Sequence, residues 1–190
     1  NVDGEGIEYE SSVEYCAEGC VAPVADPILG EWKLDGEGAA GVGPSPLDKQ
    51  WWSSTSNNGA GPDDRPCWFD DSYVFSGGGS AGSFANETGG LTLVGYQGGA
   101  EDVCAAPEAP HDGSAAATHT YVDGAGSIDG AIGELTLNGR GAYIGLAKAT
   151  NGAQITSAAA APDSITYQVM SLSADGLYMT VTLETDAGVW

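Results

Sequence analysis

The stretch PDDRPCWFDD, residues 62–71, places aspartates on both sides of Trp68. Carboxylate oxygens are the ligands that calcium prefers in proteins, so these aspartates are a candidate calcium site, although no Asp-x-Asp-x-Asp-Gly loop is present. A pair of them could also serve as the acid and the base of a hydrolase. The chain carries 27 acidic residues, so clusters of this kind are also expected by chance. The candidate ligands are Asp63, Asp64, Asp70 and Asp71.

The two histidines give little support for catalysis. His111 lies in the turn sequence PHDGS, and His119 alternates within a predicted strand. The nucleophile motif Gly-x-Ser-x-Gly, the zinc motif His-Glu-x-x-His and a Walker-type phosphate loop are all absent from the sequence. We therefore expect a protein that is not an enzyme and that needs no cofactor, calcium aside.

Aromatic side chains are the positive signal for sugar binding. Trp51 and Trp52 are adjacent, so in extended backbone they point to opposite faces, and one can be buried while the other lies open to a sugar ring or a protein neighbour. Together with Tyr143 they are the candidate glycan-binding residues. Packing in the core is the competing interpretation, and we favour it for Trp32 and Trp68.

Four cysteines in a chain that looks exported favour disulfides. Cys16 and Cys20 are close enough to close a small loop, which leaves Cys67 and Cys104 for a long-range bridge. Four cysteines allow three pairings, so this Cys16–Cys20 and Cys67–Cys104 arrangement is one hypothesis among three. A zinc site is the competing interpretation, but there is no second closely spaced cysteine pair and the histidines lie elsewhere.

The formal net charge of −22, from 5 basic and 27 acidic residues, argues against nucleic acid and anionic lipid surfaces as partners. Cations, uncharged glycans and further copies of the chain are better candidates. No run of about 18 apolar residues is present, so we expect no membrane span. The chain begins at Asn1 without a signal peptide, so we expect a mature polypeptide that is secreted, extracellular or at the cell surface. Asn86-Glu87-Thr88 is a formal glycosylation sequon.

Alternation of apolar and polar residues predicts strands. It is clearest in IEYESSVEY, residues 7–15, whose apolar positions are Ile7, Tyr9, Val13 and Tyr15. Shorter strand signals, separated by Gly, Asp, Asn and Ser clusters, follow at 28–38, 72–75, 82–86, 91–96, 117–122, 133–139, 142–146, 164–170 and 177–184. Residues 39–72 form a long irregular stretch, and 156–164 predicts one helical turn. Such a chain is all-β, an antiparallel barrel or sandwich with long loops.

Five segments occur in a recognisable order: LGEWKLDGEGAAGVGPSPLDKQWWSS, RPCWFDDSYVF, APHDGSAAATHTY, LNGRGAYIGLAKATNG and SITYQV. Together, over about residues 28–184, they resemble a lipocalin-like module of secreted surface proteins from Bacteroidetes-type bacteria. The resemblance implies an up-and-down β-barrel that opens with the strand Gly30-Glu31-Trp32. In that family the module often accompanies laminarinase-type glycoside hydrolases, which implies a glycan context without an established catalytic role. The family pattern also leads us to expect a longer closing strand after DAGVW.

The resemblance divides the chain into an N-terminal strand with a disulfide-stapled linker, residues 1–27, and a lipocalin-like β-barrel, residues 28–190. Our first hypothesis is a structural subunit that assembles into a filament or surface layer, with the strand of residues 7–15 added to the sheet of a neighbouring copy. The alternative is a glycan-binding module at the bacterial cell surface. The strand could also fold back on its own barrel, and the sequence leaves both pairings open.

Overall fold

The chain folds as an all-β protein built on one antiparallel sheet. The computed structural model describes residues 26–36, 38–54, 65–77, 82–96 and 102–190. In these residues the main sheet has seven strands, namely β1 (Gly30–Trp32), β4 (Ser72–Ser76), β5 (Gly82–Glu87), β8 (Ala117–Asp123), β9 (Gly133–Asn138), β12 (Ser164–Leu172) and β13 (Met179–Thr182). Neighbours in this sheet follow one another along the chain, with only short elements between them, so the topology is up-and-down.

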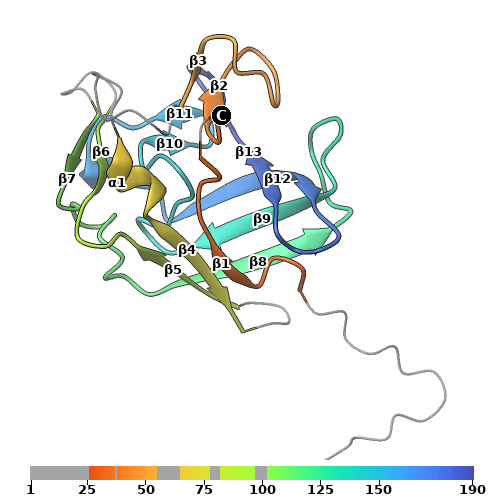
Figure 1. Cartoon of the computed structure of the whole chain (residues 1–190), viewed down its shortest axis with the longest axis horizontal. Helices are drawn as coiled ribbons and strands as arrows, with labels where there is room; N and C mark the ends of the chain where they lie inside the picture. Colours follow the sequence, from red (N-terminus) through yellow and green to blue (C-terminus); the bar gives the residue numbers. More distant parts are fainter. Residues whose placement is uncertain (1–25, 37, 55–64, 78–81, 97–101) are drawn as a thin grey trace, which may run out of the picture.

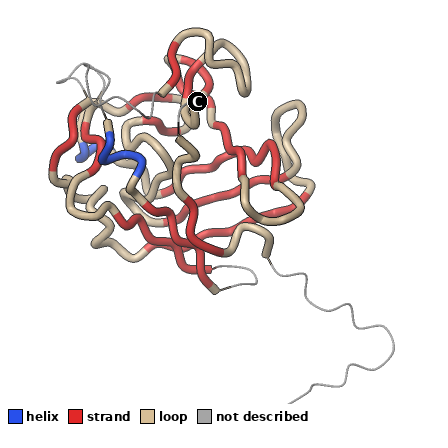
Figure 2. The backbone as a smooth tube through the Cα atoms, in the orientation of Figure 1, coloured by secondary structure: helices blue, strands red, loops and turns tan. Residues whose placement is uncertain are grey.

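The sheet curls into a half-barrel instead of closing on itself (Figure 1, Figure 2). At its centre, β9 pairs over six residues with β8 on one side and with β12 on the other. β1 and β13 are the two edges, and in the described part of the chain no strand pairs with the outer side of either. The prediction of an all-β, antiparallel fold is confirmed, and the architecture within it is an open, curled sheet.

Short elements fill the connections between the main strands. They comprise the pairs β2 (Gly41–Val42) with β3 (Trp52–Ser53), β6 (Thr92–Val94) with β7 (Val103–Ala105), β10 (Ala149–Thr150) with β11 (Ala153–Gln154), and β14 (Glu184–Thr185) with β15 (Gly188–Val189), together with the helical turns α1 (Pro66–Phe69) and η1 (Ala158–Ala160). The turn η1 confirms the helical turn predicted within 156–164. In Figure 1, β2 and β3 lie beside the C-terminus, where a bridge joins Gly43 to Val189.

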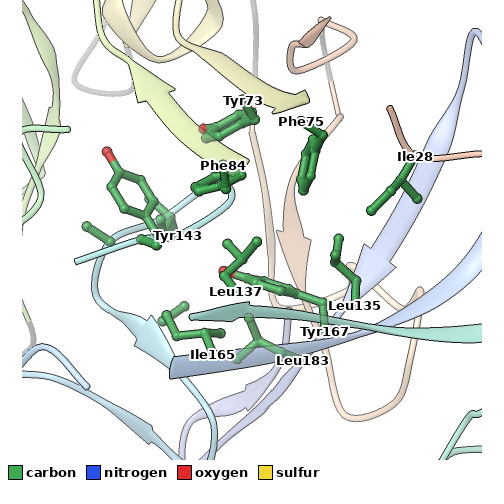
Figure 3. Close-up of a cluster of buried hydrophobic side chains, with 14 of the residues drawn as sticks. Ile28, Tyr73, Phe75, Phe84, Leu135, Leu137, Tyr143, Ile165, Tyr167 and Leu183 are labelled. Carbon is green, nitrogen blue, oxygen red and sulfur yellow. The ribbon is translucent and has the colours of Figure 1, made fainter. Parts of the chain in front are cut away.

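The period of two sends alternate side chains to the concave face of the sheet, where they form the core (Figure 3). In β12, Ile165, Tyr167 and Val169 are buried, as the alternation predicts. The other buried side chains that the main strands contribute to this core are Tyr73, Phe75, Phe84, Leu135 and Leu137. Ile28, two residues before β1, is completely buried among them and fixes the start of the described fold.

The strand predicted at 142–146 is wrong. This segment has no ladder partner and instead lies inside the half-barrel, with Ala142, Tyr143 and Leu146 buried. Side chains take the place of a strand partner: the N–H of Ile144 donates to the hydroxyl of Tyr167 at 2.9 Å, and Nδ2 of Asn86 donates to the carbonyl of Tyr143 at 2.8 Å. A short apolar run indicates that a segment is buried, but it does not indicate that the segment pairs as a strand. The strand prediction failed here for that reason.

Most of the remaining strand predictions are confirmed. The signals at 72–75, 82–86, 117–122, 133–139 and 164–170 coincide with β4, β5, β8, β9 and β12. The signals at 28–38, 91–96 and 177–184 hold shorter strands than expected, β1, β6 and β13, and β6 pairs with β7 outside the main sheet. The strand predicted at 7–15 lies outside the described residues. Over the described residues, no helix is both long and apolar enough to cross a membrane.

The side chains of Asp26 and His119 form a buried contact between the first described residue and β8, in the middle of the sheet. Oδ1 of Asp26 accepts a hydrogen bond from the N–H of Ile28, and Oδ2 lies 3.6 Å from Nε2 of His119. The His119 ring is 1% exposed and packs edge-on against Phe75. Opposite it, Gly82 leaves room for the imidazole, because a Cβ there would lie 2.1 Å from a ring carbon. His119 is therefore a packed core residue.

We predict that Tyr167→Phe destabilises the protein by about 1–2 kcal/mol, because it removes the hydroxyl that satisfies the N–H of Ile144 while keeping the ring. The free energy of unfolding from urea titrations measures the change. Tyr178→Phe is the control, since Tyr178 is 55% exposed and should lose almost nothing. Equal stability of the two variants would mean that the 142–146 segment is held without this hydrogen bond.

Candidate functional site

A groove of about 330 Å³ lies between the two edges of the main sheet. One wall comes from the end of β1 and the residues after it, including Trp32 and Leu34, and the other comes from β13 and the turn before it. Tyr73 and Ile144 line it from inside the half-barrel. The groove is thus the open seam of the half-barrel, bounded by two strands that have no partner on their outer sides within the described residues.

A second, more apolar pocket of about 120 Å³ continues the seam toward the C-terminal residues. The two cavities share Leu34, Ile144 and Val181 among their lining residues, so they are contiguous. Trp68 and Trp190 line the inner part of this second pocket. The seam therefore leads from a groove of mixed polarity at the sheet edges to a more apolar pocket beside the core.

Exposed apolar side chains border both cavities. Leu177 is 67% exposed, and Tyr178 and Leu47 are each 55% exposed. The first two line the groove and the third lines the neighbouring pocket. Apolar side chains exposed around a groove mark a surface for binding more strongly than single exposed residues do. The seam is our candidate functional site for this reason.

Two of the five basic residues line the groove. Lys33 lies 3.6 Å from Glu31 with half of its side chain exposed, and Lys49 donates a hydrogen bond to the carbonyl of Gly38. Among the described residues, Asp35 is the one acidic residue in the lining. The other three basic side chains are engaged elsewhere: Lys148 and Arg65 approach Asp102, and Arg140 donates to the carbonyls of Ala159 and Ala161. The groove is less acidic than the chain as a whole.

The adjacent tryptophans Trp51 and Trp52, at the start of β3, have different environments, as predicted. Trp52 is partly buried and stacks on Trp68 with ring centroids 6.3 Å apart, while the guanidinium of Arg65 lies 5.0 Å from its centroid. Trp51 is 56% exposed and lies close to Gly188, where a Cβ would come within 2.6 Å of its ring. Trp52 is therefore committed to packing, and only Trp51 presents a ring to the surface.

The candidate glycan-binding role of Tyr143 is not supported by its position. Its side chain is 1% exposed and packs edge-on against Tyr73 and His111. A ring enclosed in this way has no free face for a sugar. The prediction failed because residues 142–146 lie inside the half-barrel and not in a surface strand.

Buried polar groups surround Tyr143. Asp71 is 1% exposed; its Oδ2 accepts a hydrogen bond from the hydroxyl of Thr92 at 2.6 Å, and its Oδ1 has no partner within the described residues. Burial raises the pKa of Asp71 to about 7. His111 is also buried, with Nδ1 3.1 Å from the hydroxyl of Tyr96, and burial lowers the pKa of this imidazole.

The structure describes two of the four candidate calcium ligands. Asp70 is exposed while Asp71 is buried, and Asp63 and Asp64 lie outside the described residues. Where the structure describes the chain, no three His, Cys, Asp or Glu side chains are grouped closely enough to hold a metal ion. A calcium site formed by these four aspartates stays a prediction.

The predicted long-range disulfide is confirmed. Cys67 in α1 is bonded to Cys104 in β7, which ties the helical turn to the β6–β7 pair. The other predicted disulfide, Cys16–Cys20, lies outside the described residues, as do the assembly-strand residues Ile7, Tyr9, Val13 and Tyr15.

Sequence reasoning missed the seam. Its residues were recognised as strand formers around 28–38 and 177–184, but no local pattern distinguishes an edge strand from one that closes a barrel. The exposed pair Leu177-Tyr178 was the available signal, since large apolar side chains at a turn before a strand are unusual at a free surface. No protein-family model matches this chain, and neither a curated protein nor a solved structure gives a match.

We predict that Asp71→Asn removes part of the pH dependence of stability. The folded protein holds the Asp71 proton up to about pH 7, whereas an unfolded aspartate loses it near 3.8, so stability falls as the pH rises between these values. The variant should gain on the order of 2 kcal/mol over the native protein at pH 8 and much less at pH 4. Urea unfolding at pH 4 and pH 8 measures the difference in free energy of unfolding between the variant and the native protein, and Asp70→Asn is the exposed control. The same difference for Asp71→Asn at both pH values would contradict the prediction.

Proposed function

We propose that this protein is a non-enzymatic, extracellular structural subunit that assembles by adding its N-terminal strand, residues 7–15, to the sheet of a neighbouring copy. The observation that carries this proposal is the open seam: two sheet edges without strand partners in the described residues border a groove lined by both apolar and polar side chains. We keep the lipocalin-like family as part of the proposal, and the up-and-down order of the seven main strands supports it.

Strand addition follows from the physics of open edges. An unpaired edge presents a row of N–H and C=O groups that can pair with any extended segment, and natural proteins usually protect such edges. The alternating sequence IEYESSVEY supplies a segment of this kind, with one apolar and one acidic face. Because donor and acceptor are different parts of the chain, the contact is head-to-tail, and such contacts extend into filaments when they do not close into a ring.

The chemistry of the chain supports an extracellular, non-catalytic role. The Cys67–Cys104 disulfide is typical of oxidising compartments. Both histidines are buried in packing contacts, His111 beside Tyr143 and His119 beside Phe75. A net charge of −22 keeps unassembled subunits apart in solution, so specific contacts must overcome repulsion.

Full-length protein with Val13→Asp should fail to assemble, because the substitution places a charge on the apolar face of the strand. Ser12→Asp adds the same charge to the polar face and is the matched control, which should assemble like the native protein. Negative-stain microscopy and light scattering measure assembly, and circular dichroism checks the fold. Native assemblies formed by Val13→Asp would contradict the proposal.

Glycan binding at the cell surface is the second candidate, and the exposure of Trp51 favours it. An open indole beside the chain turn at Gly188 can stack on a sugar ring. Trp51→Ala should then lose retention on a β-glucan affinity gel, while Leu91→Ala, at a side chain 53% exposed, should keep it. Native protein that runs unretarded on a broad glycan panel would rule this candidate out.

A further inference from the structure

We infer that the acceptor for the donated strand is the seam itself, where residues 7–15 of a neighbouring copy lie between β1 and β13 as the eighth strand of a closed barrel. This inference rests on the proposed function and adds the receiving surface to it. The main sheet supplies seven strands in up-and-down order within the described residues, and a single inserted strand would join its two ends. About eight strands is the size at which side chains alone can fill a barrel interior.

The backbone of β13 is oriented to receive a partner. The N–H of Ile132 donates to the carbonyl of Val169 at 2.8 Å, so the polar groups of Val169 face β9. Val169 is the register partner of Val181 across the β12–β13 pair. In an antiparallel pair, two residues opposite each other either both direct their N–H and C=O groups toward the partner strand or both direct them away from it. The N–H and C=O of Val181 therefore face the seam and can pair with an added strand. Leu183, two residues further along and facing the same side, already exchanges two hydrogen bonds of 2.9 Å with Trp190, so an added strand would pair with the part of β13 before it.

The side chains of the seam match the two faces of the donor. Met179 and Val181 on one edge, and Trp32 and Leu34 near the other, are partly buried and pack against the core. A strand placed between them would direct its alternate residues inward, as these strands do. The donor's inward set is Ile7, Tyr9, Val13 and Tyr15, and its outward set includes Glu8, Glu10 and Glu14.

The charge of the rim suits these glutamates. Lys33 and Lys49 line the groove in a chain that has only five basic residues. Glu31 beside Lys33 and Asp35 in the lining offset much of this positive charge, so the described part of the groove is close to neutral. Opposite charges on neighbouring strands stabilise pairing, and like charges there destabilise it. An acidic strand therefore meets less repulsion at this groove than the net charge of the chain would suggest.

The donor's length and position are compatible with this geometry. Residues 7–15 are nine residues long, as is β12, whereas β1 and β13 have three and four residues. The edges therefore pair with the middle of the donor, and its ends extend beyond them. The donor ends eleven residues before Asp26, the first described residue, which lies next to the start of β1.

The experiment begins with full-length variants of the seam. Lys33→Glu with Lys49→Glu makes the seam repel the donor glutamates and should raise the concentration needed for assembly about tenfold or more. Leu177→Asp, at a rim side chain 67% exposed, is a second seam variant that leaves the core untouched and should also weaken assembly. Adding Glu8→Lys and Glu10→Lys to the variant in which Lys33 and Lys49 are glutamates (the double lysine variant) restores the net charge of −22. This fourfold variant should assemble again.

Mixing then identifies the pairing. Val13→Asp has a defective donor and an intact seam, and the double lysine variant has the reverse, so together they should form a 1:1 dimer that cannot extend, measured by light scattering. If the seam variants assemble like the native protein while Val13→Asp does not, the acceptor lies elsewhere and only this inference fails. If the mixed variants stay monomeric, the strand folds on its own sheet and the transfer between copies is overturned. Assembly that survives Val13→Asp overturns the proposed function itself.

Discussion

The structure depends on filling the concave face of a sheet that curls without closing. A curled sheet buries one face only if something occupies its interior, and here the chain's own segment 142–146 does so. The backbone of such a segment must find hydrogen bonds away from any ladder. Tyr167 and Asn86 supply them, and the indole of Trp68 donates to the carbonyl of Gly145 at 3.0 Å. Polar tips of large core side chains thus hold the interior segment in place.

The interior position of residues 142–146 also explains why titratable side chains are buried around it. The segment brings Tyr143 beside His111 and near Asp71, so several titratable groups are buried together. Burial is the largest cause of the shifted pKa in both Asp71 and His111; the hydrogen bond from Thr92 comes second for Asp71, and the charge of Asp112 comes second for His111. Perturbed groups often mark active sites, but structural burial gives the same signature. Here Thr92 and Tyr96 supply one hydrogen bond each, to Asp71 and His111, while Oδ1 of Asp71 has no partner within the described residues.

The irregular chain around Trp68 is held by a further set of interactions. Trp52 packs between Trp68 and Trp190, Arg65 lies over its ring, and the carboxylate of Asp102 receives two hydrogen bonds from Lys148. The Cys67–Cys104 disulfide crosses the same region. Stacking, ion pairing and a covalent bond therefore hold this irregular part of the chain. The backbone of Trp190 also exchanges hydrogen bonds with Leu183, directly after β13.

The sequence by itself determined the strand-rich class and most of the main strands, because a period of two survives in any sheet that has one buried face. Cysteine spacing and parity led to the Cys67–Cys104 bond, and backbone alternation separated Trp51 from Trp52. Only the tertiary structure decided that Tyr143 is interior and that β1 and β13 are edges. Local patterns record whether a side chain prefers burial, whereas edges and grooves depend on which distant strands meet, and no single stretch of residues encodes that.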